Sequence, residues 1–127
     1  SIELCLDGQG SKILARGVQI EQVLINLLIN ARDAIQENNV EEGRLIFQTR
    51  VLNNNLIEIS LSDNGPGISE RLLETIFEPF QTTKKSGIGL GLSISRSIVE
   101  SHGGHIWASN LSQGGAVLGF ALPLFHD

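Results

Sequence analysis

The sequence predicts an α+β fold, a two-layer sandwich in which a mixed, mainly antiparallel sheet is covered on one face by about three helices. Strand patterns occur mostly in adjacent pairs, and helical patterns separate these pairs. Adjacent hairpins favour this architecture over a doubly wound parallel sheet. The chain has 127 residues, a length at which a single domain buries roughly two thirds of its unfolded surface. We therefore expect one domain over residues 1–127.

The first third of the chain predicts a strand, a glycine-containing loop and a long helix. Alternating apolar residues indicate the strand at residues 1–6. The helix is expected to start near residues 18–21 and to end in the polar run 36–39. Its apolar residues follow helical spacing and form one broad arc, which consists of Ile20, Val23, Leu24, Leu27, Leu28, Ala31 and Ile35.

The middle of the chain predicts a hairpin and then a short helix. Residues 45–51 and 57–61 alternate in hydropathy, and three asparagines between them form the turn. The second strand delivers Asp63 at its end. Ser69 is the expected N-cap of a helix that runs to about Ile76, because a proline beyond that point blocks continuation.

A second long helix is expected from about residue 90. Its apolar side consists of Ile94, Ile98 and Val99, and the glycine pair at 103–104 predicts its end.

Residues 105–110 and 116–124 then alternate as two further strands. Trp107 is expected to pack within the first of them. His102, in the last helical turn, is better explained by the helix C-terminus than by catalysis.

Two asparagines in the long helix are the first candidate functional residues. Asn26 and Asn30 are the only polar residues between Val23 and Ala31, and they lie on one side of the helix together with Asp33. One interpretation is a polar bond that fixes helix packing, because an unpartnered buried amide costs about 1–3 kcal/mol. The other is a metal site, because an amide oxygen is a hard, neutral ligand that suits Mg²⁺. The neighbouring motifs favour the second interpretation.

The segment from Asp63 to Gly67 must turn sharply after its strand. In isolation it indicates a simple turn in which Asp63 bonds its own loop. Beside the other motifs it predicts an adenine site, because a carboxylate accepts the N–H of the exocyclic amine, whereas guanine presents a carbonyl there. Gly67, which lacks a side chain, would let the base lie against the loop.

The glycine run at residues 87–92 lacks the pattern of a dinucleotide fingerprint, a P-loop or a protein-kinase glycine loop. It offers unshielded N–H groups at a helix start, which favour phosphate oxygens. The alternative is flexibility at the helix start. The polar segment 81–86 before it predicts a mobile flap, in which Lys84 and Lys85 either pair with a phosphate or remain solvated. Together the motifs predict a site for Mg-ATP.

Composition narrows the function further. The net charge is −5 with no basic tract, which argues against a nucleic-acid surface. Cys5 is the single cysteine, so no disulfide framework is expected. No apolar run reaches the length of a membrane span, and we expect a soluble, unprocessed fragment without direct membrane contact.

The motifs resemble those of the catalytic, ATP-binding domain of bacterial sensor histidine kinases of the two-component type. This family belongs to the superfamily shared with gyrase, mismatch-repair and chaperone ATPases. The resemblance covers nearly the whole chain and rests on four boxes of the family: the N box at 22–31, the G1 box at 63–67, the F box at 77–80 and the G2 box at 87–92. It implies the Bergerat ATP-binding fold.

The resemblance also implies roles for individual residues. Asn30 would bind Mg²⁺, Asp63 would bind adenine, and Asn26, close to the phosphates, would act in catalysis together with Lys84. Residues 81–88 would form the ATP lid. Further nucleotide contacts are implied for Asp33, Gly65, Gly67, Ile68, Phe80, Thr83, Gly87, Gly89, Leu90, Gly91 and Leu92.

Three departures from the family pattern refine the assignment. Asn26 stands where hydrolysing relatives carry a water-activating Glu, which favours phosphoryl transfer over hydrolysis. Asp33 replaces a Lys found in many histidine kinases, and the flap is short; both features resemble the subgroup attached to PAS-type sensor domains, such as nitrogen-regulatory and oxygen-sensing kinases. Ala116 and Val117 occupy positions where many relatives have a hydroxyl residue.

The implied function is transfer of the ATP γ-phosphate to a histidine on the dimerisation and phosphoacceptor domain of the same protein, upstream of a response-regulator receiver domain. No histidine of this chain has the family's acceptor setting, so we expect ATP binding without autophosphorylation. The fragment would be a cytoplasmic monomer, from a homodimeric protein that can be anchored in the inner membrane. Two alternatives remain open: a serine kinase or ATPase of the same superfamily, and a non-catalytic nucleotide-binding regulatory module.

Overall fold

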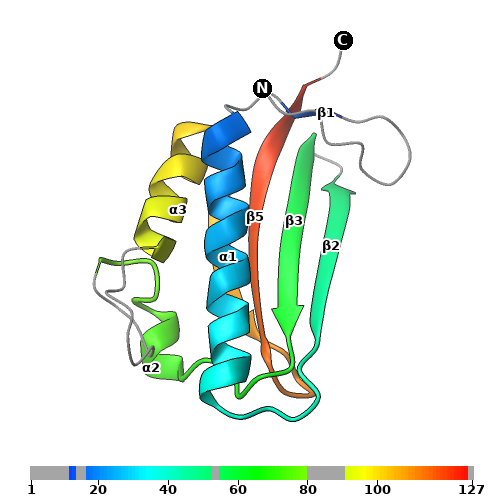
Figure 1. The fold of residues 1–127 in the computed structure, drawn as a ribbon. Helices are drawn as coiled ribbons and strands as arrows, with labels where there is room; N and C mark the ends of the chain where they lie inside the picture. Colours follow the sequence, from blue (N-terminus) through cyan, green and yellow to red (C-terminus); the bar gives the residue numbers. More distant parts are fainter. Residues whose placement is uncertain (1–11, 14–16, 53–54, 80–90, 126–127) are drawn as a thin grey trace.

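The computed structural model describes residues 12–13, 17–52, 55–79 and 91–125 (Figure 1). Within these ranges the elements follow one another as β1 (Lys12–Ile13), α1 (Gly17–Glu37), β2 (Leu45–Leu52), β3 (Leu56–Asp63), α2 (Glu70–Leu73), α3 (Gly91–Ser101), β4 (His105–Asn110) and β5 (Ala116–Phe125).

The sheet is organised around β5. This strand pairs with β3 over residues 117–123, with β4 over 116–121 and with β1 at 124–125. The hairpin partner β2 continues the sheet beyond β3. All of these pairings are antiparallel, which confirms the mainly antiparallel sheet; no parallel pairing occurs among the described strands.

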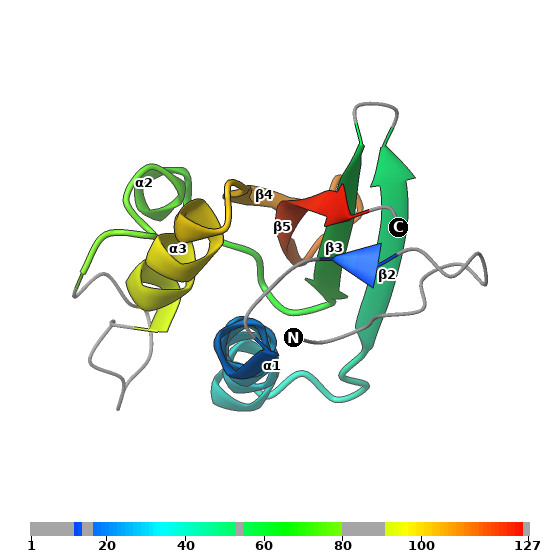
Figure 2. The ribbon, with the colours of Figure 1, turned by 90° about the horizontal axis from the view of Figure 1, so that it is seen from above.

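The helices form the second layer of the predicted sandwich. Helices α1 and α3 lie side by side on one face of the sheet, and the short α2 lies near α3 (Figures 1 and 2). The core fills the space between these helices and the central strands. It consists of Ile20, Val23, Leu27, Ala31, Ile57, Ile59, Leu61, Ile76, Leu92, Val99, Leu118, Phe120 and Leu122.

Helix α1 ends where the sequence predicts, but its buried face is narrower than the expected arc. Val40 N donates to Ile35 O at 3.1 Å and Asn39 N to Gln36 O at 3.3 Å, which is the Schellman pattern of a helix end. Leu28, placed in the buried arc by its spacing, is 45% exposed. The expectation was wrong there, because β3 and α3, which contact the helix, leave Leu28 uncovered.

The first described strand lies where the sequence predicts a loop. β1 is a two-residue strand that pairs with the end of β5. A segment this short carries no alternation that the sequence could reveal. The expected strand at residues 1–6 lies outside the described residues.

Helix α2 is shorter than expected. Ser69 is its N-cap as predicted, with its Oγ accepting from Leu72 N at 3.2 Å. The helix was expected to reach about Ile76 but ends at Leu73. Beyond it the chain changes to tighter bonds between residues three apart, from Thr75 N to Leu72 O and onward.

Helix α3 has the predicted end, and two of its three predicted apolar residues face the core: Val99 is buried and Ile98 packs against the core. Gly104 N donates to Val99 O and Gly103 N to Glu100 O, both at 3.0 Å, the Schellman bonds that the glycine pair predicts. Ile94, expected on the apolar side, is 46% exposed. The buried positions are Leu92, Ser95 and Val99, because a polar contact to α1 draws Ser95 inward.

Two side chains behave as the sequence predicts. His102 Nδ1 lies 2.8 Å from Ile98 O, a contact at the helix C-terminus. The Trp107 ring packs over Gly119, where an added Cβ would lie 2.6 Å from the ring.

At Gly104, which follows α3, the backbone lies in close contact with strand β5. We predict that Gly104→Ala lowers the free energy of unfolding by about 3 kcal/mol. A Cβ at this position would overlap the carbonyl oxygen of Ala121. Urea unfolding followed by circular dichroism measures the loss. Gly114→Ala is the control, because Gly114 has φ +106 but nothing within 4 Å, so it should lose only the backbone strain of about 1–2 kcal/mol. A smaller loss for Gly104→Ala than for Gly114→Ala would contradict the prediction.

Candidate functional site

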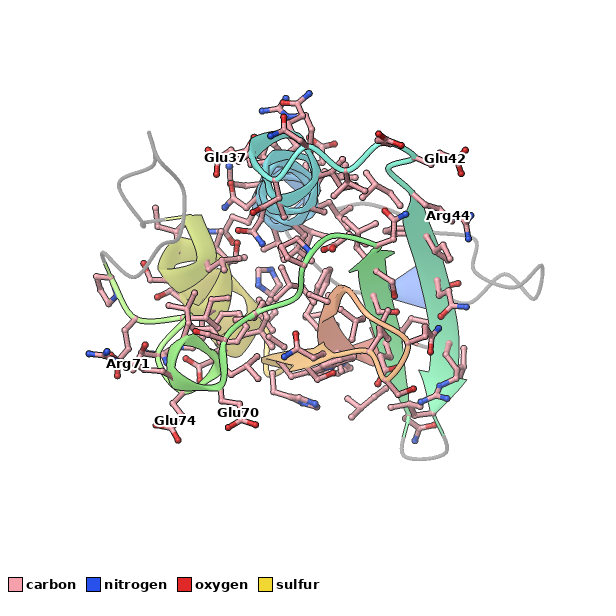
Figure 3. All side chains as sticks on the ribbon, turned by 90° about the horizontal axis from the view of Figure 1, so that it is seen from below. Glu37, Glu42, Arg44, Glu70, Arg71 and Glu74 are labelled. Atoms are coloured by element: carbon pink, nitrogen blue, oxygen red, sulfur yellow. The ribbon has the colours of Figure 1, made fainter. Side chains whose placement is uncertain are left out.

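The candidate site lies where the chain leaves the sheet after β3. Seen from this end of the molecule, the segment 64–69 crosses from β3 to α2 between α1 and the β4–β5 turn (Figure 3). Glu42 and Arg44 lie on one side of this crossing, and Glu70, Arg71 and Glu74 lie on the other (Figure 3).

Asp63 is the last residue of β3 and is only 7% exposed. Its Oδ1 accepts from Gly65 N at 2.8 Å, so the carboxylate does bond its own loop, as the turn interpretation predicts. Every buried side-chain nitrogen or oxygen of the described residues has a partner. The second oxygen, which bonds to no described residue, is therefore reached by solvent. Asp63 thus keeps one fixed acceptor and one open acceptor.

Asn64, treated only as a turn residue at the level of sequence, joins the loop to the α1–β2 connection. Its Oδ1 accepts from Arg44 N and its Nδ2 donates to Glu42 O, both at 2.7 Å. The partners are about twenty residues away in sequence, so no local pattern reveals them.

The β4–β5 hairpin supports the other half of the loop. Asn110 Oδ1 accepts from Ile68 N at 2.7 Å, and Asn110 Nδ2 donates to Ile68 O at 2.6 Å. Gly67, with φ +85, approaches so closely that a Cβ would lie 2.9 Å from Asn110 Oδ1. The space that a side chain at Gly67 would fill is therefore next to the hairpin, whereas the sequence analysis expected a base there.

Asn26 connects α1 to the first turn of α3. Its Nδ2 donates to Gly91 O and to Ser95 Oγ, both at 3.0 Å, and its Oδ1 accepts from Gln22 Nε2 at 2.8 Å. Ser95, which is fully buried, also donates to Gly91 O at 2.8 Å. This matches the packing interpretation of Asn26, and the sequence analysis missed Ser95 because a serine is ordinarily a surface residue.

Asn30 lies between the start of α3 and the loop. Asn26, Asn30 and Ala34 are spaced four residues apart, on one side of α1. Asn26 bonds to Gly91, and Ala34 lies against Gly65. Asn30 is therefore about 6 Å along the helix axis from each contact. Its side chain is half-buried and forms no hydrogen bond with another described residue.

The remaining predicted contacts divide into two groups. Asp33 is half-buried and forms an ion pair with Arg32 at 3.2 Å, and the Leu92 side chain is buried in the core, so only the backbone of Leu92 can meet a ligand. The others lie outside the described residues: Phe80, Thr83, Lys84, Gly87, Gly89 and Leu90.

Among the described residues no group of three or more His, Cys, Asp or Glu side chains gathers into a metal cage. None of the described helices has the length and hydropathy that a bilayer-spanning segment requires.

Comparison with protein families gives a match over residues 15–126 to the family described as "Histidine kinase-, DNA gyrase B-, and HSP90-like ATPase". The chain is 41% identical over 122 residues to the sensor protein FixL of Bradyrhizobium diazoefficiens, which covers 96% of this chain and 24% of FixL. It is 41% identical over 119 residues to the signal transduction histidine-protein kinase AtoS of Escherichia coli, which covers 94% of this chain and 19% of AtoS. The chain therefore spans a quarter or less of these relatives.

Solved structures agree with the sequence comparisons. The catalytic domain of histidine kinase ThkA, in a nucleotide-free form, matches with a TM-score of 0.78 and 40% identity, over 93% of this chain and 74% of that one. ThkA in complex with the response regulator protein TrrA matches with a TM-score of 0.73 and 36% identity, over 93% of this chain and 32% of that one.

The contact between α1 and α3 generates a prediction about Ser95. Replacing Ser95 by Ala removes one acceptor of Asn26 and one donor to Gly91 O, so the free energy of unfolding should fall by about 1 kcal/mol. Ser97→Ala is the matched control, because Ser97 is exposed on the same helix and should lose nothing measurable. Equal urea midpoints for the two variants would show that the bonds of Ser95 do not stabilise the helix pair.

Proposed function

The chain belongs to the family of histidine kinase-, DNA gyrase B- and HSP90-like ATPases, among the catalytic domains of histidine kinases, and we propose that it binds Mg-ATP and transfers the γ-phosphate to a histidine. The observation that carries this proposal is the carboxylate of Asp63, buried at a strand end with one oxygen fixed and the other open.

The open oxygen of Asp63 is the proposed acceptor for the exocyclic amine of adenine. A carboxylate accepts hydrogen bonds and donates none, so it favours adenine over guanine at this position. The bond from Gly65 N holds the other oxygen and fixes the direction of the carboxylate. Because Asp63 is almost fully buried, its bond to the base would be little weakened by competing water.

The proposed phosphate end lies at the start of α3. The backbone N–H groups of Gly91 and Leu92 are in the first turn of this helix, where unpaired N–H groups and the helix dipole favour anions. Asn26 holds this turn through Gly91 O. The glycine run before it and Lys84 in the proposed lid extend the phosphate contacts by analogy with the family.

Asn30 is the proposed Mg²⁺ ligand. It lies between the base end and the phosphate end of the site, and no described residue occupies its amide. Mg²⁺ commonly takes one or two ligands from the protein and the others from phosphates and water. When bound, it would neutralise charge that develops on the transferring phosphoryl group.

Transfer is favoured over hydrolysis. Asn26 has no basic atom that could activate water. Its amide oxygen already bonds to Gln22 in α1, and its amide nitrogen bonds to Gly91 and Ser95 in α3. His102 contacts the end of α3 and His105 lies in β4, so neither has the exposed helical setting of the family's acceptor histidine. We propose that the acceptor is a histidine on a helical domain of the same protein, a homodimer, with a response regulator downstream.

Two substitutions test the site. Asp63→Asn keeps an acceptor for Gly65 N but replaces the open oxygen with an N–H donor, so affinity for a fluorescent ATP analogue should fall by at least about tenfold. Asn30→Ala should abolish the gain in affinity that Mg²⁺ brings and leave the metal-free affinity unchanged. Glu58→Gln, which removes a carboxylate from the same strand, and Gln36→Ala, which removes an exposed amide side chain from helix α1, are the controls. The assignment fails if all five proteins bind alike.

Phosphoryl transfer is tested with γ-labelled ATP. Alone, the chain should acquire no label. With a separate helical hairpin that carries the acceptor histidine of a sensor kinase, label should appear on the hairpin and be lost in acid, as phosphohistidine is. Label that survives acid would favour a serine kinase, and phosphohistidine on the chain itself would refute a separate acceptor. ATP binding with no transfer to any hairpin would favour a regulatory module.

A further inference from the structure

The loop that carries the proposed adenine site has few bonds of its own. Between Asp63 and Ser69 the chain belongs to neither a helix nor a strand, and Pro66 has no backbone N–H. At the near end, Asn64 N donates to Arg44 O at 3.3 Å and Gly65 N to Asp63 Oδ1 at 2.8 Å. The far end must be held by another part of the chain.

We propose that Asn110 is a positioning residue for nucleotide binding, which holds the loop so that Asp63 faces the base. This inference rests on the proposed function. Asn110 is the last residue of β4, and its side-chain amide bonds to both backbone groups of Ile68. The N–H and C=O of Ile68 are thus paired as they would be by a neighbouring strand, but by a single side chain.

The bonds of Asn110 are additional to its role in the sheet. Its backbone already pairs opposite Ala116 in the β4–β5 hairpin. The side chain therefore does not end the strand or shape the turn, which Leu111 N closes by donating to Gly115 O at 2.9 Å. It reaches across 42 residues of sequence to the loop.

The same hairpin holds the start of the loop. Gly115, with φ +94, lies so close that an added Cβ would overlap the carbonyl oxygen of Asp63. Gly67 also lies close to this hairpin, because an added Cβ would be 2.9 Å from Asn110 Oδ1. The hairpin thus contacts the loop at both ends, at Asp63 through Gly115 and at Ile68 through Asn110. Close contact at Asp63 and paired bonds at Ile68 leave the segment between them little freedom to turn the carboxylate away.

The inference predicts that loss of the Asn110 bonds weakens binding of the base and leaves binding of the phosphates unchanged. In Asn110→Ala, both bonds to Ile68 are lost, and affinity for Mg-ATP and for adenosine should fall by roughly tenfold. Affinity for inorganic tripolyphosphate with Mg²⁺ should not change, because the start of α3 makes no bond to Asn110. Ser112→Ala in the same hairpin, an exposed residue whose hydroxyl donates to the neighbouring Gln113, is the control. Competition with a fluorescent ATP analogue gives all three affinities.

A second variant and a spectroscopic measurement separate positioning from general stability. Asn110→Asp keeps the shape and the acceptor for Ile68 N but loses the donor to Ile68 O, and it should weaken adenosine binding as Asn110→Ala does. Hydrogen exchange followed by NMR should show the Ile68 amide less protected in Asn110→Ala, which loses its acceptor, with the Ile59 amide of β3 unchanged in both variants.

The outcomes are distinct. If the unaltered chain binds neither ATP nor adenosine, the proposed function fails, and this inference fails with it. If the chain binds both and the Asn110 variants bind them equally well, the inference alone is refuted. It is also refuted if adenosine and tripolyphosphate are weakened alike, or if the protection of Ile59 falls together with that of Ile68, because Asn110 would then support only the fold.

Discussion

Among the described residues no strand pairs with the loop between β3 and α2, and asparagine side chains supply the hydrogen bonds that a paired strand would give. Backbone N–H and C=O groups that are removed from water need hydrogen-bond partners. The side-chain amide of asparagine can bond to either group, because its nitrogen donates and its oxygen accepts. Asn64 bonds to the backbone of residues 42 and 44, and Asn110 bonds to that of Ile68. The carboxylate of Asp63 consequently has a fixed direction although it lies at the start of a loop. Preorganised groups of this kind lose little freedom when a ligand binds.

Helix α1 links this loop to the rest of the site. Its buried face packs against β3 and α3, and its side toward the site meets Gly91 through Asn26 and Gly65 through Ala34. A rigid helix therefore sets the separation between the proposed phosphate end and the proposed base end. Phosphoryl transfer depends mainly on positioning and charge stabilisation, so a scaffold that fixes this separation is what the chemistry requires.

Local patterns in the sequence predicted the sandwich, the strand that ends at Asp63, and the glycine end of α3, because each depends on neighbours within a few residues. Predictions failed where tertiary contacts decide burial. Leu28 and Ile94 have the spacing of core residues and are exposed, since no strand or helix covers them in the described part of the chain. Ser95 and Asn110 were missed for the converse reason: their partners are 69 and 42 residues away. At the candidate site, the sequence indicated Asp63 and Asn26 as candidates. It did not reveal Asn110 and Ser95, the side chains that bond to the loop and to Asn26.

The central claim is that the open oxygen of Asp63 accepts a hydrogen bond from the amine of adenine. The most direct measurement compares the affinity of the unaltered chain for ATP with that for the triphosphate of purine riboside, which differs from ATP only in lacking this amine. The account predicts that the analogue binds at least about tenfold more weakly, because the buried carboxylate is left without a donor, and that Asp63→Asn removes most of this difference. Equal affinities of the unaltered chain for the two nucleotides would contradict the account.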